Sequence, residues 1–160
     1  ESCRVLAERY PELKDELGIV VYGKDSEQLK PLVPFQVYPL NYISNEKELI
    51  DVYNSVDLFV TPSLEENLPN TIMEAMACGI PCVGFNVGGI PQMIDHLHNG
   101  YVAQYKSADD LANGICWTLT EGDYETLSSE AYRKAVTTYS EATVASQYIR
   151  IYNHITGKNA

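Results

Sequence analysis

The chain has 160 residues, of which 45% are hydrophobic and 21% charged, the composition of one globular domain. Asp and Glu outnumber Lys and Arg by 22 to 11, and the net charge of −11 argues against nucleic acid or an anionic membrane surface as a partner. The four cysteines form no C-x-x-C pair, which favours reduced, buried thiols and a cytoplasmic location over disulfides or a metal site.

The N-terminal residues 2–14 are predicted to form a helix that is broken or kinked near Pro11. Short apolar strands are expected after it, at 18–23, 35–44, 57–63, 80–86 and 100–105. Helical segments are expected at 26–33, 45–56 and 69–78, and another is expected to start at Pro91. The part from 107 to 160 is expected to be mostly helical. Asn45 is suited to cap one of these helices, and Gly79 to end another.

The order of these elements indicates the fold class. Strands that alternate with helices and are apolar throughout indicate a parallel sheet covered by helices on both faces. We therefore expect an α/β, Rossmann-like fold, with residues 1–160 as a single domain. A βα unit normally begins with its strand, whereas this chain begins with a helix, so we expect a first strand to be missing from it.

Two acids are the strongest candidates for a site. Glu66 is expected in the loop after the strand at 57–63, where open parallel sheets bind their ligands. Glu74 is expected in the second turn of a helix that is otherwise almost wholly apolar. A buried carboxylate needs a partner, yet no Lys or Arg occurs between Lys47 and Lys106. Glu74 pairs with a cation from elsewhere in the fold, accepts hydrogen bonds from ligand hydroxyls, or is simply the solvent-facing residue of its helix.

Two predicted helix starts add to this candidate site. The N–H groups near Asn70, Thr71 and Ile72, with the positive end of the helix dipole, favour a phosphate. The stretch NVGGIPQ at 86–92 supplies a second helix start flanked by glycine. There the backbone either approaches a ligand closely or forms an ordinary strand-to-helix turn.

The run DLFVTPSLEENLPNTIMEAMACGIPCVGFNVGGIPQMI resembles the donor-binding, C-terminal half of retaining GT-B glycosyltransferases, which use nucleotide sugars. The family pattern is an acid, seven residues, a second acid, Ala-Met-Ala-x-Gly, a strand and Gly-Gly-Ile-Pro. In this chain the pattern runs from Glu66 through Glu74 to Pro91. The segment HNGYVA at 98–103 and the last helix are also similar to family segments.

The resemblance implies a role for each matching residue. Glu66 would be the catalytic residue, in contact with the donor sugar near its anomeric centre, and Glu74 would hold the ribose hydroxyls. The loop that faces the sugar and the diphosphate would comprise Asn67, Leu68, Asn70 and Thr71. The loop beside the nucleotide base would comprise Asn41, Tyr42, Ile43 and Ser44. Transfer would retain anomeric configuration through an oxocarbenium-like transition state, with no metal and no cofactor besides the nucleotide-sugar substrate.

This chain departs from the family in two ways. Many relatives have Gly-Phe-Gly after the first acid, whereas Pro69 ends the corresponding stretch here and lacks an N–H donor. The family's diphosphate-binding Arg and Lys follow the strand expected to be missing, and the acceptor domain that precedes it is absent too. The resemblance therefore implies that transfer to a saccharide or lipid-linked acceptor in polysaccharide synthesis needs that second domain. The second domain would also supply any peripheral membrane contact, and this chain alone is expected to be inactive.

Other functions stay open on the sequence. Paired carboxylates also serve glycoside hydrolases, although the helix starts favour phosphate binding. A non-catalytic nucleotide-sugar-binding module that has kept the fold is another alternative. A nucleotide-sugar epimerase is a third, against which the Ala-Met-Ala after Glu74 argues. His96 and His98 offer too few ligands for a metal site, and we expect a surface loop there.

Overall fold

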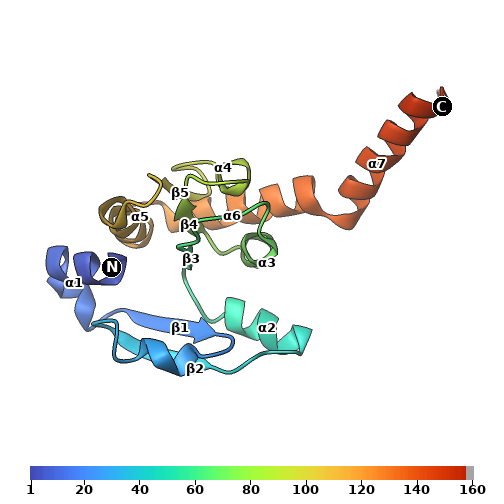
Figure 1. Ribbon diagram of the computed structural model, residues 1–160. Helices are drawn as coiled ribbons and strands as arrows, with labels where there is room; N and C mark the ends of the chain where they lie inside the picture. Colours follow the sequence, from blue (N-terminus) through green and yellow to red (C-terminus); the bar gives the residue numbers. More distant parts are fainter. Residues whose placement is uncertain (158–160) are drawn as a thin grey trace.

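The computed structural model describes residues 1–157 (Figure 1). The strands are β1 (Gly18–Tyr22), β2 (Gln36–Leu40), β3 (Phe59–Thr61), β4 (Cys82–Phe85) and β5 (Gly100–Ala103). The α-helices are α1 (Ser2–Arg9), α2 (Glu46–Tyr53), α3 (Asn70–Ala77), α4 (Ile90–Met93), α5 (Ala108–Thr120), α6 (Tyr124–Lys134) and α7 (Glu141–Thr156). The remaining elements are the 3-10 turns η1 (Pro11–Lys14) and η2 (Ser26–Leu29) and the π-helical turn η3 (Ala135–Tyr139).

The predicted order of elements is confirmed. The N-terminal helix breaks before Pro11, as expected, and the part after residue 107 is helical. The predicted helical part extends to residue 160, and its last three residues lie outside the described residues. The helix expected from Pro91 is a single turn, because the backbone becomes extended at Ile94.

The strands form two parallel sheets and not the one sheet that the sequence predicts. β1 pairs with β2, and β4 pairs with β3 on one side and β5 on the other. No strand within residues 1–157 pairs with both β1 and β3, so the ladder is interrupted between them, and Figure 1 shows the two sheets apart. β4 is fully buried because it is the central strand of its sheet and α3, α4 and α5 pack against it, whereas β1 is only partly buried.

Local capping explains where the helices begin and end. The Asn45 side chain accepts hydrogen bonds from the backbone N–H groups of Lys47 and Glu48 at the start of α2, which confirms the predicted cap. α3 begins after Pro69 and ends at Ala77, and the φ of +74° at Gly79, two residues later, allows the chain to reverse. The helices α5, α6 and α7 are each capped by a side chain that accepts a hydrogen bond from a backbone N–H group in the first turn; the capping residues are Ser107, Asp123 and Ser140.

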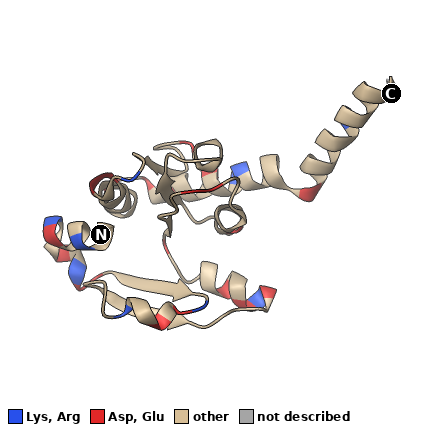
Figure 2. Cartoon of the chain, in the orientation of Figure 1, with Lys and Arg blue, Asp and Glu red and all other residues tan. Residues whose placement is uncertain are grey.

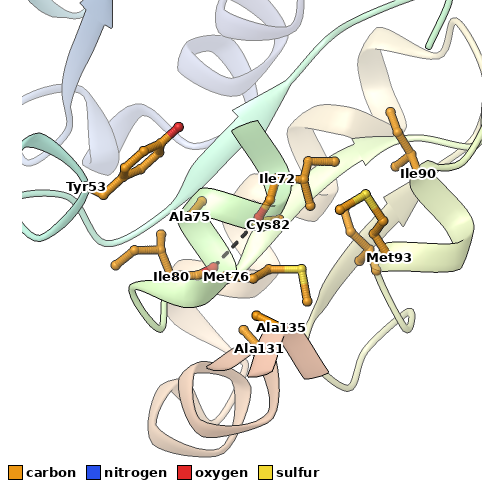
Figure 3. Packing of buried hydrophobic residues seen from close by; sticks show 11 residues of the cluster. Tyr53, Ile72, Ala75, Met76, Ile80, Cys82, Ile90, Met93, Ala131 and Ala135 are labelled. Atoms are coloured by element: carbon orange, nitrogen blue, oxygen red, sulfur yellow. Dashed lines mark hydrogen bonds between the residues drawn. The ribbon is translucent and has the colours of Figure 1, made fainter. Parts of the chain in front are cut away.

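The apolar side chains form two buried clusters. α3 contributes Ile72, Ala75 and Met76 to the first cluster, where they pack against Ala131 and Ala135 (Figure 3). The second cluster joins α1 and α5 to β4 and includes Leu6, Val83, Phe85 and Leu111. The first cluster fixes α3, and therefore the candidate site residues that α3 carries.

Candidate functional site

The loop that carries Glu66 lies against the Gly88–Gly89 turn at the C-terminal ends of β3 and β4. The Gly89 N–H donates a hydrogen bond to the Asn67 carbonyl oxygen at 2.5 Å. A Cβ atom on Gly88 would overlap the carbonyl oxygen of Glu66. The sequence left this turn as either a close approach to a ligand or an ordinary turn. In the structure the backbone of the Gly88–Gly89 turn closely approaches the loop that carries Glu66.

The side chains of this loop are open to solvent. Glu66 is half-buried, whereas Asn67, Leu68 and Asn70 are exposed. The segment after β5 also holds this loop, because the Tyr105 hydroxyl donates a hydrogen bond to the Leu64 carbonyl oxygen at 3.1 Å. Pro69 is buried where the loop enters α3. Glu66 therefore projects from a backbone that is held on two sides, next to the start of a helix.

Glu74 is not buried, which corrects the expectation that its helix is largely enclosed. α3 buries Ile72, Ala75 and Met76 on one side and leaves the Glu74 side exposed. The polar partner of Glu74 is nevertheless a core residue: the Tyr53 hydroxyl donates to Glu74 Oε2 at 2.9 Å. Glu74 is thus both a solvent-facing residue of its helix and part of a hydrogen-bond chain to a buried tyrosine.

Tyr53 is a site residue that sequence reasoning missed. It ends α2 and is only 3% exposed, and its hydroxyl lies 3.0 Å from that of Tyr22 in β1. Burial raises the pKa of Tyr53, and the hydrogen bonds with Tyr22 and Glu74 raise it further, so the phenol stays protonated. The apolar stripe of α2 marks Tyr53 as a core residue, but nothing in the sequence signals its contact with Glu74, 21 residues further along.

The predicted base loop, Asn41 to Ser44, lies between β2 and α2 and is largely exposed, with Tyr42 80% exposed. It is joined to the Glu74 region through α2, which begins just after the loop and ends at Tyr53. The structure thus connects the predicted base loop to Glu74, and it holds the Glu66 loop against the Gly88–Gly89 turn.

An open cavity of about 970 Å³ lies between α2, α3 and α6. Its lining includes Tyr53, Glu74, Cys78, Ser128 and Tyr132 but not Glu66 or the loop around it. The cavity therefore touches the predicted donor site only at the Glu74 end.

The segment that carries the two acids has no Lys or Arg of its own. The chain has no Lys or Arg between Lys47 and Lys106, and Figure 2 shows β3, α3 and β4 without either. No group of three or more His, Cys, Asp or Glu side chains within the described residues is placed to hold a metal ion. His96 and His98 are exposed, as predicted, and His98 Nε2 lies 3.3 Å from Glu130.

The parallel strands and the helices that cover them define a class of protein, an α/β domain of the Rossmann-like type. Residues 1–121 match the family model of the glycosyl transferases group 1. This chain belongs to that family. No helix within residues 1–157 has the length and apolar character needed to span a membrane.

Relatives of the chain are glycosyltransferases by name. It is 32% identical over 115 residues to an uncharacterized glycosyltransferase of Haemophilus influenzae, a match that covers 70% of this chain and 32% of the relative. It is 27% identical over 146 residues to the N,N'-diacetylbacillosaminyl-diphospho-undecaprenol alpha-1,3-N-acetylgalactosaminyltransferase of Campylobacter jejuni, covering 89% of this chain and 39% of that enzyme. The chain thus spans about a third of the length of these curated relatives.

A solved structure with a similar fold is Anabaena HepE in complex with UDP and glucose. It superposes with a TM-score of 0.74 at 21% identity and covers 94% of this chain and 44% of HepE. At this identity the likeness establishes the fold alone.

Proposed function

We propose that this chain is the donor-binding part of a retaining glycosyltransferase that moves a sugar from a nucleotide diphosphate sugar to a saccharide or lipid-linked acceptor. The observation that carries the proposal is that an ordered acid lies on each side of the start of α3, Glu66 in the loop before it and Glu74 in its second turn. Glu66 projects from a loop held by the Gly88–Gly89 turn, and Glu74 is held by a buried tyrosine. Family membership supports it, as does the fold shared with HepE, whose structure contains UDP and glucose.

Each acid serves a different part of the donor in this proposal. Glu74 accepts hydrogen bonds from the ribose hydroxyls, because a carboxylate can accept two such bonds at once. Glu66 contacts the sugar as positive charge develops at its anomeric carbon. The backbone at Asn70 and Thr71 and the α3 dipole face the diphosphate, and the loop from Asn41 to Ser44 lies beside the base. The reaction uses no metal ion, and we place it in the cytoplasm, where the four free cysteines stay reduced.

Glu74→Ala in the full-length protein tests the nucleotide half of this proposal. Loss of a hydrogen-bonded charged group weakens nucleotide diphosphate binding by about 1.5–3 kcal/mol. Isothermal titration calorimetry measures it, and unchanged affinity would exclude the ribose role.

Glu66→Gln tests the sugar half. Turnover falls while nucleotide diphosphate affinity stays nearly the same, because Glu66 acts on the sugar and its transition state. Equal losses in turnover and in nucleotide affinity would show that the two acids do not bind separate parts of the donor.

We also propose that these 160 residues bind nucleotide weakly and transfer no sugar by themselves. The motif region has no Lys or Arg to neutralise a leaving diphosphate, and backbone N–H groups and a helix dipole do so only in part. The acceptor must also be held against the anomeric carbon. Nucleotide sugars are incubated with the purified chain and a panel of saccharide and lipid acceptors. Acceptor-dependent release of nucleotide diphosphate would refute the proposal.

A further inference from the structure

Tyr53 occupies a rigid position at the junction of three elements. Its ring makes edge-to-face contacts with Tyr22 of β1, at 6.4 Å between centroids, and with Phe59 of β3, at 6.0 Å. The side chain is 3% exposed and belongs to the cluster around α3. A ring packed in this way has one orientation, so its hydroxyl oxygen has one position.

The hydrogen-bond chain through this hydroxyl has a fixed direction. A carboxylate only accepts, and a phenol carries a single proton, so Tyr53 donates to Glu74 Oε2 at 2.9 Å. The Tyr22 hydroxyl, 3.0 Å away, then donates to the Tyr53 oxygen. The Thr71 carbonyl, 3.4 Å from the same hydroxyl, is the weaker competitor for the proton. The order is therefore Tyr22 to Tyr53 to Glu74.

We propose that Tyr53 is the positioning residue for Glu74 in ribose recognition, an inference that rests on the proposed role of Glu74. An exposed glutamate has several rotamers of similar energy, and most of them point away from any one ligand. Donation from a buried, immobile hydroxyl holds Oε2 in place and leaves lone pairs on both oxygens for the ligand. The carboxylate is then in its binding orientation before the nucleotide arrives, which lowers the entropy lost on binding.

The same residue joins the base side of the site to the ribose side. α2 begins one residue after Asn45, directly following the loop predicted to lie by the base, and ends at Tyr53. Its eight residues span about 12 Å. The Asn45 cap fixes one end of the helix, and the Tyr53–Glu74 hydrogen bond fixes the other. Base loop and ribose acid are thus held at a set spacing by one short helix.

Tyr53→Phe in the full-length protein is the direct test, because it keeps the ring packing and removes only the hydroxyl. The probe is the tightest binder among UDP, GDP, ADP and CDP, together with its 2′,3′-dideoxy counterpart. We expect the variant to bind the ribonucleotide about tenfold more weakly, the lower end of the effect of a charged hydrogen bond. Its affinity for the dideoxy nucleotide should equal that of the wild type, since no ribose hydroxyl remains for Glu74 to meet.

Tyr101→Phe is the matched control. The Tyr101 hydroxyl also donates to a carboxylate at 2.9 Å, that of Asp110, but between β5 and α5 and away from Glu74. The two variants remove the same chemical group, so thermal unfolding shows whether their stability losses are comparable. Tyr101→Phe should leave the affinity for both nucleotides unchanged. An equal loss of affinity in both variants would mean that the effect of Tyr53 is only structural.

A double variant separates this inference from the function on which it rests. If Tyr53 acts through Glu74, Tyr53→Phe adds nothing to the loss already caused by Glu74→Ala. If Glu74→Ala weakens nucleotide binding but Tyr53→Phe does not, the positioning role is refuted and the proposed function stands. If Glu74→Ala has no effect, both fall. Should Tyr53→Phe fail to fold, Tyr22→Phe removes the preceding donor and is expected to cause a smaller loss with the same dependence on ribose hydroxyls.

Discussion

Gly89→Ala is the sharpest perturbation of the site that the structure offers. The φ of Gly89 is −88°, which any residue adopts, so the substitution adds no backbone strain. The new Cβ would overlap the Asn67 carbonyl oxygen and lie 2.8 Å from Leu68 Cδ1. The Glu66 loop must move, and its hydrogen bond from the Gly89 N–H, 2.5 Å long, must break or stretch.

The expected magnitude follows from these two effects. Overpacking costs about 1–3 kcal/mol and the lost hydrogen bond about 1 kcal/mol, so the free energy of unfolding should fall by about 2–4 kcal/mol. If the exposed loop moves instead of the core, the stability loss is smaller and the catalytic loss larger. A displacement of Glu66 by about 1 Å lowers turnover by about a hundredfold.

Two assays distinguish these outcomes. Urea denaturation of the 160-residue chain gives the stability loss, and donor turnover of the full-length protein gives the catalytic loss. Gly157→Ala is the control, because Gly157 has a φ of +68° and a Cβ added there would meet no atom within 4 Å, so the substitution adds strain without a clash. It should cost about 1 kcal/mol and leave turnover unchanged. If Gly89→Ala had both wild-type stability and wild-type turnover, the conclusion that the Gly88–Gly89 turn holds the Glu66 loop in place would be refuted.

Three further results are expected. Met76→Ala empties a fully buried site and lowers the free energy of unfolding by about 2–5 kcal/mol in urea; a loss under about 1 kcal/mol would contradict the packing of α3. Hydrogen bonds from the Thr126 side chain and backbone hold the pKa of Asp123 below its usual value, so the charged form stabilises the fold above about pH 4 and this gain is lost as the pH falls through the lowered pKa. Asp123→Asn keeps a cap without the charge, so its Tm deficit should be present at neutral pH and vanish in acid; a deficit independent of pH would oppose this. Burial, and after it the Glu74 carboxylate, raises the pKa of the Cys78 thiol, so Glu74→Gln should speed alkylation at Cys78, measured by mass spectrometry, and an unchanged rate would exclude the coupling.

Most of the helices and strands could be predicted from short-range sequence patterns. The alternation of apolar strands and helices, the Asn45 cap and the stop at Gly79 depend on residues a few positions apart, and the structure confirms them. The placement of Glu66 in a loop and of Glu74 in the following helix has the same origin, since Pro69 separates the two segments.

Tertiary contacts decided how these pieces form a site. The split into two sheets depends on which strands find a partner, and a strand's apolar pattern does not reveal its neighbours. The exposure of Glu74 depends on which side of α3 packs against α6. Because the sequence of this helix is almost wholly apolar, it has no separate polar and apolar faces from which that side could be predicted. Tyr53 and Glu74 are 21 residues apart, so their hydrogen bond exists only because the fold brings the end of α2 beside α3. The sequence by itself thus placed Glu66 in a loop and Glu74 in a helix, whereas packing between distant segments brought Tyr53 to Glu74 and decided which side of α3 is exposed.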